Sequence, residues 1–74
     1  MIKTAKTIQP GDIFRAEFGD YDNICEFVFI SCRECTPNCT ETTVRYPRGK
    51  TVFNIYEFRH IDKVTYDVVG KEVI

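Results

Sequence analysis

The chain contains no leucine and only two alanines among its 74 residues, whereas valine, isoleucine and threonine together supply 23. Six phenylalanines and four tyrosines add to them. Residues branched at Cβ and aromatic residues fit the pleated, half-buried surface of a sheet, and the residues that favour helices are the scarce ones. The composition therefore predicts an all-β chain.

The length restricts what such a chain can do. We expect residues 1–74 to form a single domain whose core only just offsets the conformational entropy of folding. A chain of 74 residues is too short to form two lobes with a deep cleft between them, which excludes large multi-step enzymes. The longest apolar run, residues 27–30, is far too short to cross a bilayer, so no membrane partner is expected.

Apolar alternation and turn residues locate the strands. The strands are predicted at residues 13–18, 24–32, 41–46, 51–56 and 64–68. Phe58, Ile61 and Val64 follow one another at intervals of three, which predicts a single helical or 3₁₀ turn within residues 56–62.

Residues 24–32 are apolar on both faces except at two positions, which predicts a central strand covered on both sides. Residues 33–40 contain Pro37 and Asn38 and are expected to form a loop. Phe14 lies on the face of the first strand that we expect to point into the core.

Five strands in hairpins, with a helical turn before the last strand, are typical of a small five-stranded SH3-like barrel. Closing the sheet removes exposed edges that so short a chain cannot cover. An OB-like barrel or a two-layer β-roll is the alternative. Unrelated functions share these architectures, so the fold class predicts no activity by itself.

Three of the four cysteines lie close together in the sequence, as Cys32, Cys35 and Cys39. Two thiolates two residues apart can bind zinc at tetrahedral angles, and a third could join from the far side of the loop, so these three are candidate metal ligands. Cys25 would lie roughly 23 Å from Cys32 along an extended strand and cannot join them. Free thiols without a cofactor are the favoured interpretation, and a disulfide at Cys35 or Cys39 is a further alternative.

The residues available for catalysis are few. The chain has one serine, Ser31, and one histidine, His60, and its four glycines are isolated from one another, so no phosphate-binding loop exists. Nucleophilic catalysis requires a nucleophile, a base and an orienting group. A dyad of cysteine and His60 is the remaining catalytic alternative, although a half-exposed structural histidine is more common at such a position. We therefore expect a non-enzymatic protein.

Basic residues alternate with aromatic residues in segments 45–50 and 56–60, and an acidic loop surrounds Tyr21. The net charge of −1 gives no overall attraction to nucleic acid. Cations at turns often only keep strand edges soluble, and acids in a loop are often only solvated. If both patches bind, their opposite charges favour a protein partner. The expected binding residues are Tyr21, Arg45, Tyr46, Arg48, Lys50 and Arg59.

These observations predict a small module that binds a protein partner as an inhibitor or an adaptor, of the kind encoded by viruses that infect bacteria. The alternative is a nucleic-acid-binding β-barrel, stabilised by zinc or not, that would also use Lys63. Residues 1–8 lack the apolar stretch of a secretory signal, which predicts a cytoplasmic protein with reduced cysteines. A dimer formed through unpaired strand edges is a further alternative.

Overall fold

The computed structural model describes residues 1–17 and 23–72. Its elements in chain order are β1 (Ile2–Thr4), β2 (Asp12–Glu17), β3 (Ile24–Thr36), β4 (Cys39–Arg45), β5 (Val52–Glu57), the 3₁₀ turn η1 (Ile61–Lys63) and β6 (Thr65–Lys71). The described ranges contain no α-helix, so the prediction of an all-β chain is confirmed. Within them, no helix has the length and apolar character needed to span a membrane.

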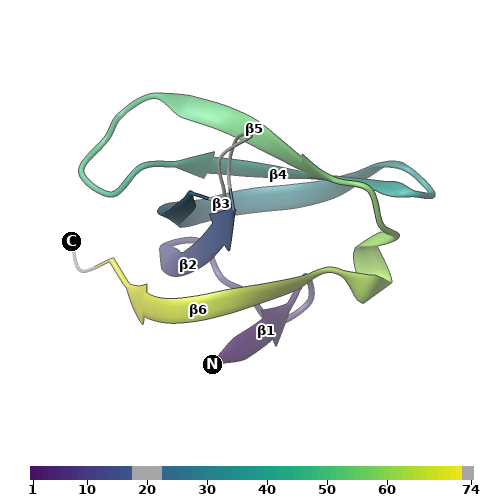
Figure 1. The fold of residues 1–74 in the computed structure, drawn as a ribbon, viewed down its shortest axis with the longest axis horizontal. Coiled ribbons are helices and arrows are strands. Elements are labelled where there is room, and N and C mark those ends of the chain that lie inside the picture. The colour runs from purple at the N-terminus through teal and green to yellow at the C-terminus, as the bar shows by residue number, and fades with distance from the viewer. Residues whose placement is uncertain (18–22, 73–74) are drawn as a thin grey trace.

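The strands form one antiparallel sheet in the order β1-β6-β2-β3-β4-β5 (Figure 1). The sheet is not closed, since β1 and β5 are its two edges. The predicted number of five strands is wrong, and a closed SH3-like barrel is not confirmed. The additional strand, β1, pairs with β6, with Ile2 opposite Asp67 and Lys3 opposite Tyr66. Three residues are too few to show an alternation, so only pairing with a distant segment reveals this strand.

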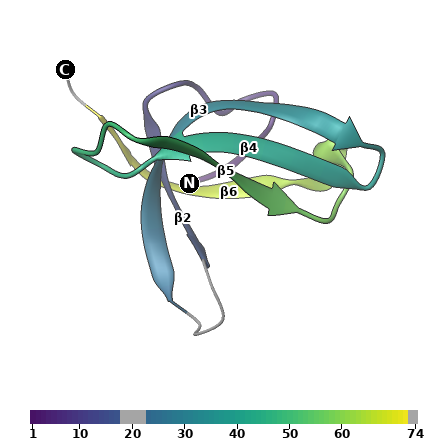
Figure 2. The same ribbon diagram turned by 90° about the horizontal axis from the view of Figure 1, so that it is seen from above.

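β3 is the longest strand, with 13 residues. It pairs with β2 and then with β4, and its register with β4 slips between Phe29 and Ser31 and again between Glu34 and Thr36. Such bulges bend a strand. Figure 2 shows β2 and the first part of β3 projecting from the rest of the sheet.

The predicted loop at residues 33–40 is wrong. β3 continues to Thr36 and β4 begins at Cys39, which leaves only Pro37 and Asn38 in the turn. Backbone pairing between the strands outweighs the polar composition that suggested a loop. The turn residues themselves were correctly identified.

The core lies mainly on the inner face of the curled sheet. Phe27, Val28 and Phe29 are all buried, which confirms the prediction for the middle of β3, whereas Ile24 at its start is exposed. The buried apolar cluster consists of Ile8, Phe14, Phe27, Phe29, Val44, Val64, Tyr66 and Val68. Ile8 comes from the segment between β1 and β2, which the strand pattern had not placed in the core.

One hydrogen bond shows how strongly the sheet curls. The hydroxyls of Thr42 in β4 and Tyr66 in β6 lie 2.9 Å apart, although two strands separate β4 from β6 in the sheet. Burial raises the pKa of Tyr66 to about 12, so this hydroxyl is protonated at neutral pH. β4 and β6 therefore face each other across the core.

The 3₁₀ turn before the last strand is confirmed, but it forms at Ile61–Lys63, because Tyr56 and Glu57 still belong to β5. His60 caps it, since its Nδ1 accepts a hydrogen bond from the Asp62 backbone N–H at 3.2 Å. Val64, directly after the turn, is buried in the core. The turn itself contains no buried residue, and it leads the chain into the core at Val64.

Candidate binding surface

Arg45 is the last residue of β4, and its side chain makes contacts that stabilise the fold. Its guanidinium forms an ion pair with Glu72 and hydrogen bonds of 3.4 Å each to the carbonyl oxygens of Tyr46 and Gly49. Its charge is therefore balanced within the protein. Sequence reasoning missed this because Glu72 is 27 residues away.

Tyr46 lies partly in the core and partly on the surface. Its ring stacks on Phe27, with centroids 5.7 Å apart, and packs at 5.0 Å against Phe53. Tyr46 is nevertheless 45% exposed. Arg48 and Lys50, the other predicted binding residues in this turn, are exposed.

The predicted binding residues do not form one patch. Arg59 lies beyond the far end of β5 from the β4–β5 turn, a strand length of roughly 20 Å, and its Nε is 3.3 Å from Glu57. Lys63 is exposed at the end of η1. Tyr21 lies outside the described residues.

A different surface lies on the outer face of β3, β4 and β5. Arg33 forms a two-pronged contact with Glu41, with Nε to Oε1 at 2.9 Å and Nη2 to Oε2 at 3.3 Å. The Tyr56 hydroxyl donates to the same carboxylate at 3.1 Å. The hydrogen bond from Arg33 has the largest effect on Glu41 and lowers its pKa, and the hydrogen bond from Tyr56 lowers it further. Partial burial acts in the opposite direction but is outweighed. These contacts hold an exposed guanidinium and an exposed phenol ring in fixed positions.

Apolar side chains accompany this network along the edge of the sheet. Val52 and Tyr56 in β5 are 53% and 55% exposed, and Phe58, just after the strand, is 85% exposed. We call Arg33, Glu41, Val52, Tyr56 and Phe58 the β5 surface. Sequence reasoning did not select these five as binding residues. The sequence did contain one signal for this surface. Tyr56 and Phe58 continue the alternation on the face of the predicted strand that points to solvent.

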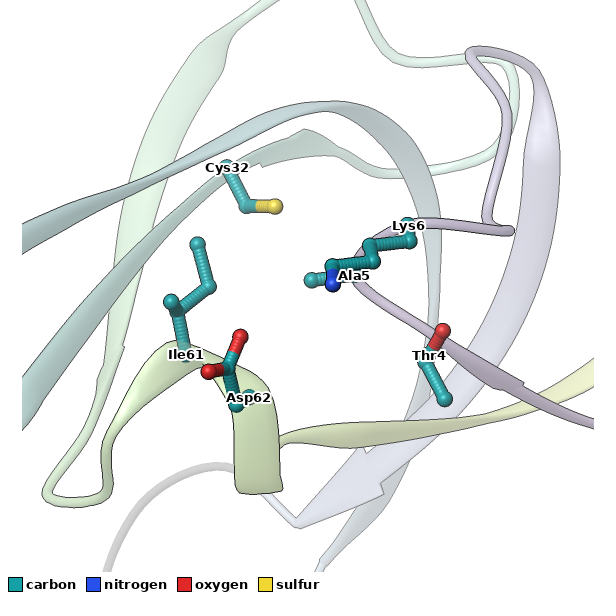
Figure 3. A pocket seen from close by; sticks show the side chains of 6 residues that line it. All are labelled: Thr4, Ala5, Lys6, Cys32, Ile61 and Asp62. Atoms are coloured by element: carbon teal, nitrogen blue, oxygen red, sulfur yellow. The ribbon is translucent and has the colours of Figure 1, made fainter.

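A cavity of about 320 Å³ lies between the segment after β1, the second half of β3 and η1. Figure 3 shows the Lys6 ammonium, the Asp62 carboxylate and the Cys32 thiol directed toward the same hollow. Thr4, Ala5 and Ile61 complete its lining. Of the predicted site residues that the structure describes, only Cys32 lines it.

The three candidate metal ligands are separated by the continuation of β3. Cys32 packs against the core, whereas Cys35, three residues further along the strand, is exposed. Cys35 instead lies beside Cys39, and its Sγ donates to the Cys39 carbonyl oxygen at 3.3 Å. Among residues 1–17 and 23–72, no three side chains of histidine, cysteine, aspartate or glutamate are grouped so as to hold a metal ion. A zinc site of all three cysteines remains a prediction from the sequence.

His60 lies between two carboxylates, with Nε2 3.6 Å from Glu34 and Nδ1 3.6 Å from Asp62.

Comparison with known proteins finds no relative: no family model, no curated protein and no solved structure matches the chain. Function therefore has to be inferred from the arrangement of the side chains.

Proposed function

We propose that this protein is a small non-enzymatic module that binds a partner protein through the β5 surface and acts as an inhibitor or an adaptor. The observation that carries the proposal is the position of β5 at an edge of the sheet, with Val52, Tyr56 and Phe58 exposed along it. The free edge of a strand offers backbone N–H and C=O groups to an added strand, and the side chains beside it give specificity.

The composition of the β5 surface supports a protein partner. Exposed tyrosine and arginine side chains are the ones that most often dominate binding energy at protein interfaces. Here Tyr56 and Arg33 are held in place by Glu41, so little side-chain freedom is lost when a partner binds. An interface of roughly 800 Å² per partner is within the reach of so small a domain.

The charges favour a protein over nucleic acid. Arg33, Arg45 and Arg59 each have a carboxylate within ion-pair distance. Binding to nucleic acid depends on cations that neutralise phosphates. The nucleic-acid alternative would rely on Arg48, Lys50 and Lys63, and it predicts an affinity that falls steeply with salt.

We also propose that β2 to β6 form an open version of the five-stranded SH3-like barrel. The order β6-β2-β3-β4-β5, the 3₁₀ turn between β5 and β6, and the contact of Thr42 with Tyr66 across the core support it. β1 is then an additional edge strand. The cytoplasm, where free cysteines are the usual state, is the proposed location.

The experiment that tests the function is affinity capture from a lysate of the source cells, with and without nuclease, followed by titration of the captured protein. The double variant Tyr56→Ser, Phe58→Ser is compared with Val69→Ser, which changes an exposed apolar residue on β6. We expect a protein that is captured in both nuclease arms. Its affinity should fall at least tenfold in the double variant and by less than twofold in Val69→Ser.

Two results would contradict the proposal. An unchanged affinity of the double variant would remove the β5 surface as the binding site. Capture that disappears with nuclease, together with weaker binding of Arg48→Ala, would establish the nucleic-acid alternative instead.

A further inference from the structure

The end of the β3–β4 hairpin brings two thiols together. Glu34 is opposite Thr40 and Thr36 is opposite Cys39, so Cys35 is the extra residue of a β-bulge. If the register of Glu34 with Thr40 continued regularly, Cys35 would stand opposite Cys39, but the bulge gives that position to Thr36. Cys35 nevertheless stays beside Cys39, since its Sγ donates to the Cys39 carbonyl oxygen at 3.3 Å.

The pairing of β3 with β4 limits how far apart the two cysteines can lie. Opposed residues in an antiparallel pair have Cα atoms roughly 4.5–5.5 Å apart, and Cys35 is the direct neighbour of Thr36, which opposes Cys39. A disulfide needs Cα atoms roughly 4.4–6.8 Å apart. The short turn of Pro37 and Asn38 keeps the two strands paired up to Thr36 and Cys39.

The thiols also influence each other electrostatically. Hydrogen bonding to the Cys35 thiol, with partial burial and the nearby Glu41 carboxylate, raises the pKa of Cys39. Cys35 is exposed whereas Cys39 is half-buried, so a reagent from solution reaches Cys35 more easily. This asymmetry assigns the first contact with a reagent to Cys35.

We propose that Cys35 and Cys39 are a dithiol site that closes to a disulfide by exchange with a low-molecular-weight disulfide of the glutathione type. The Cys35 thiolate attacks the reagent, whose S–S bond breaks, and a mixed disulfide forms as one thiolate leaves. The Cys39 thiolate then attacks the Cys35 sulfur and releases the second thiolate. Both protein thiols are oxidised, the reagent is reduced to two thiols, and the protons of the cysteines end on those thiols at neutral pH.

The other two cysteines are placed outside this reaction. Cys32 packs against the core and lines the cavity next to η1, and Cys25 lies in the part of β3 that pairs with β2. The proposal is independent of the protein-binding function, because it rests only on the hairpin end.

The test is oxidation of the folded, full-length protein with glutathione disulfide, followed by alkylation of the remaining thiols and tryptic mass mapping. Cleavage after Arg15, Arg33 and Arg45 puts Cys25 and Cys32 in one peptide and Cys35 and Cys39 in the next. We expect the second peptide to carry an internal disulfide, about 2 Da lighter than its reduced form, while Cys25 and Cys32 are recovered alkylated. Cys39→Ser should instead accumulate a mixed disulfide with glutathione at Cys35.

Cys32→Ser is the matched control and should oxidise at the wild-type rate. Two results would overturn the proposal: a wild-type protein that retains the mixed disulfide at Cys35 with Cys39 alkylated, or a cross-link joining the two peptides through Cys32. Circular dichroism of each variant before oxidation verifies that the variant is folded. If Cys39→Ser is unfolded, the wild-type and Cys32→Ser maps still decide between these results.

Discussion

The Asp12 carboxylate links the start of β2 to β1 and to the segment that connects the two strands. It is 2% exposed, its Oδ2 is 2.9 Å from the Lys3 ammonium, and it accepts a hydrogen bond of 2.9 Å from the Gln9 backbone N–H. Burial acts to raise the pKa of Asp12, but the contacts with Gln9 and Lys3 outweigh it and the pKa is lowered. The ionised form is therefore the one that stabilises the fold.

Replacing Asp12 by asparagine should lower the free energy of unfolding at pH 7 by about 1–3 kcal/mol, because the partly buried Lys3 ammonium loses its carboxylate partner. The folded pKa lies below the unfolded one, so the contribution is complete above about pH 4 and is lost as the pH falls through the folded pKa. The variant and wild type should thus converge in acid. Urea unfolding at pH 7 and pH 3 measures this, with Asp67→Asn on the exposed face of β6 as the control.

Arg48 has an unfavourable backbone conformation. It is the third residue of the turn closed by the hydrogen bond from the Gly49 N–H to the Tyr46 carbonyl oxygen, and its φ is 64°. A side chain in this left-handed region costs roughly 1 kcal/mol, which glycine avoids.

Arg48→Gly should therefore raise the free energy of unfolding by about 0.5–1 kcal/mol. Arg48→Ala removes the same charge but keeps a Cβ, and should give no gain. Thermal unfolding of both variants separates the two causes. An equal gain in both would mean that the charge, not the backbone, limits stability here.

At the scale of elements, strands that are not neighbours in the sheet contact each other through side chains. Thr42 in β4 and Tyr66 in β6 are both buried, and their hydroxyls have each other as hydrogen-bond partners. An unpaired buried hydroxyl costs more free energy than an exposed one, because it gives up its water without compensation.

Thr42→Val should thus lower the free energy of unfolding by about 1–2 kcal/mol, because the Tyr66 hydroxyl loses Thr42 and keeps only the Cys32 thiol, a weaker partner. Thr43→Val is the matched control: it is the next residue of β4, and its hydroxyl donates to Asn54 in an exposed pair. The control should change stability by less than about 0.5 kcal/mol. Chemical denaturation measures the free energy of unfolding of both variants. Equal decreases in the two would show that the contact between Thr42 and Tyr66 stabilises the fold no more than an exposed hydrogen bond does.

At the scale of the whole molecule, the N-terminal segment completes the core. Ile8 is 5% exposed, although the strand pattern assigned it no position there. Its backbone N–H donates to the Thr4 carbonyl oxygen at 2.9 Å, which closes the turn after β1. Covering the core thus depends on a segment outside the predicted strands.

Ile8→Ala should lower the free energy of unfolding by about 2–4 kcal/mol, as expected for a large apolar side chain removed from a packed core. Ile24→Ala is the control, because Ile24 is 68% exposed and should change stability by less than about 0.5 kcal/mol. Chemical denaturation compares the two. A cost for Ile8→Ala no larger than that of the control would mean that this segment does not cover the core.

The candidate site could be predicted only in part. The sequence pattern correctly placed Arg48 in an exposed turn, with Tyr46 and Lys50 beside it. It could not show that the Glu72 carboxylate forms an ion pair with Arg45. It also grouped Cys32 with Cys35 and Cys39, because spacing along the chain does not reveal a strand that continues through all three positions. The contact of Cys35 with Cys39 depends on how β3 pairs with β4, a property of two segments and not of one.

The sequence by itself determined the β class, the buried middle of β3, most of the strands and the 3₁₀ turn before the last strand. These features depend on local alternation and on side chains that favour extended backbone, which a single segment carries. Only the tertiary structure decided the order of the strands, the edge strand β1, the length of the β3–β4 hairpin and the place of Ile8. Those depend on which distant segments satisfy one another's backbone hydrogen bonds and exclude water together, and no stretch of sequence specifies that alone.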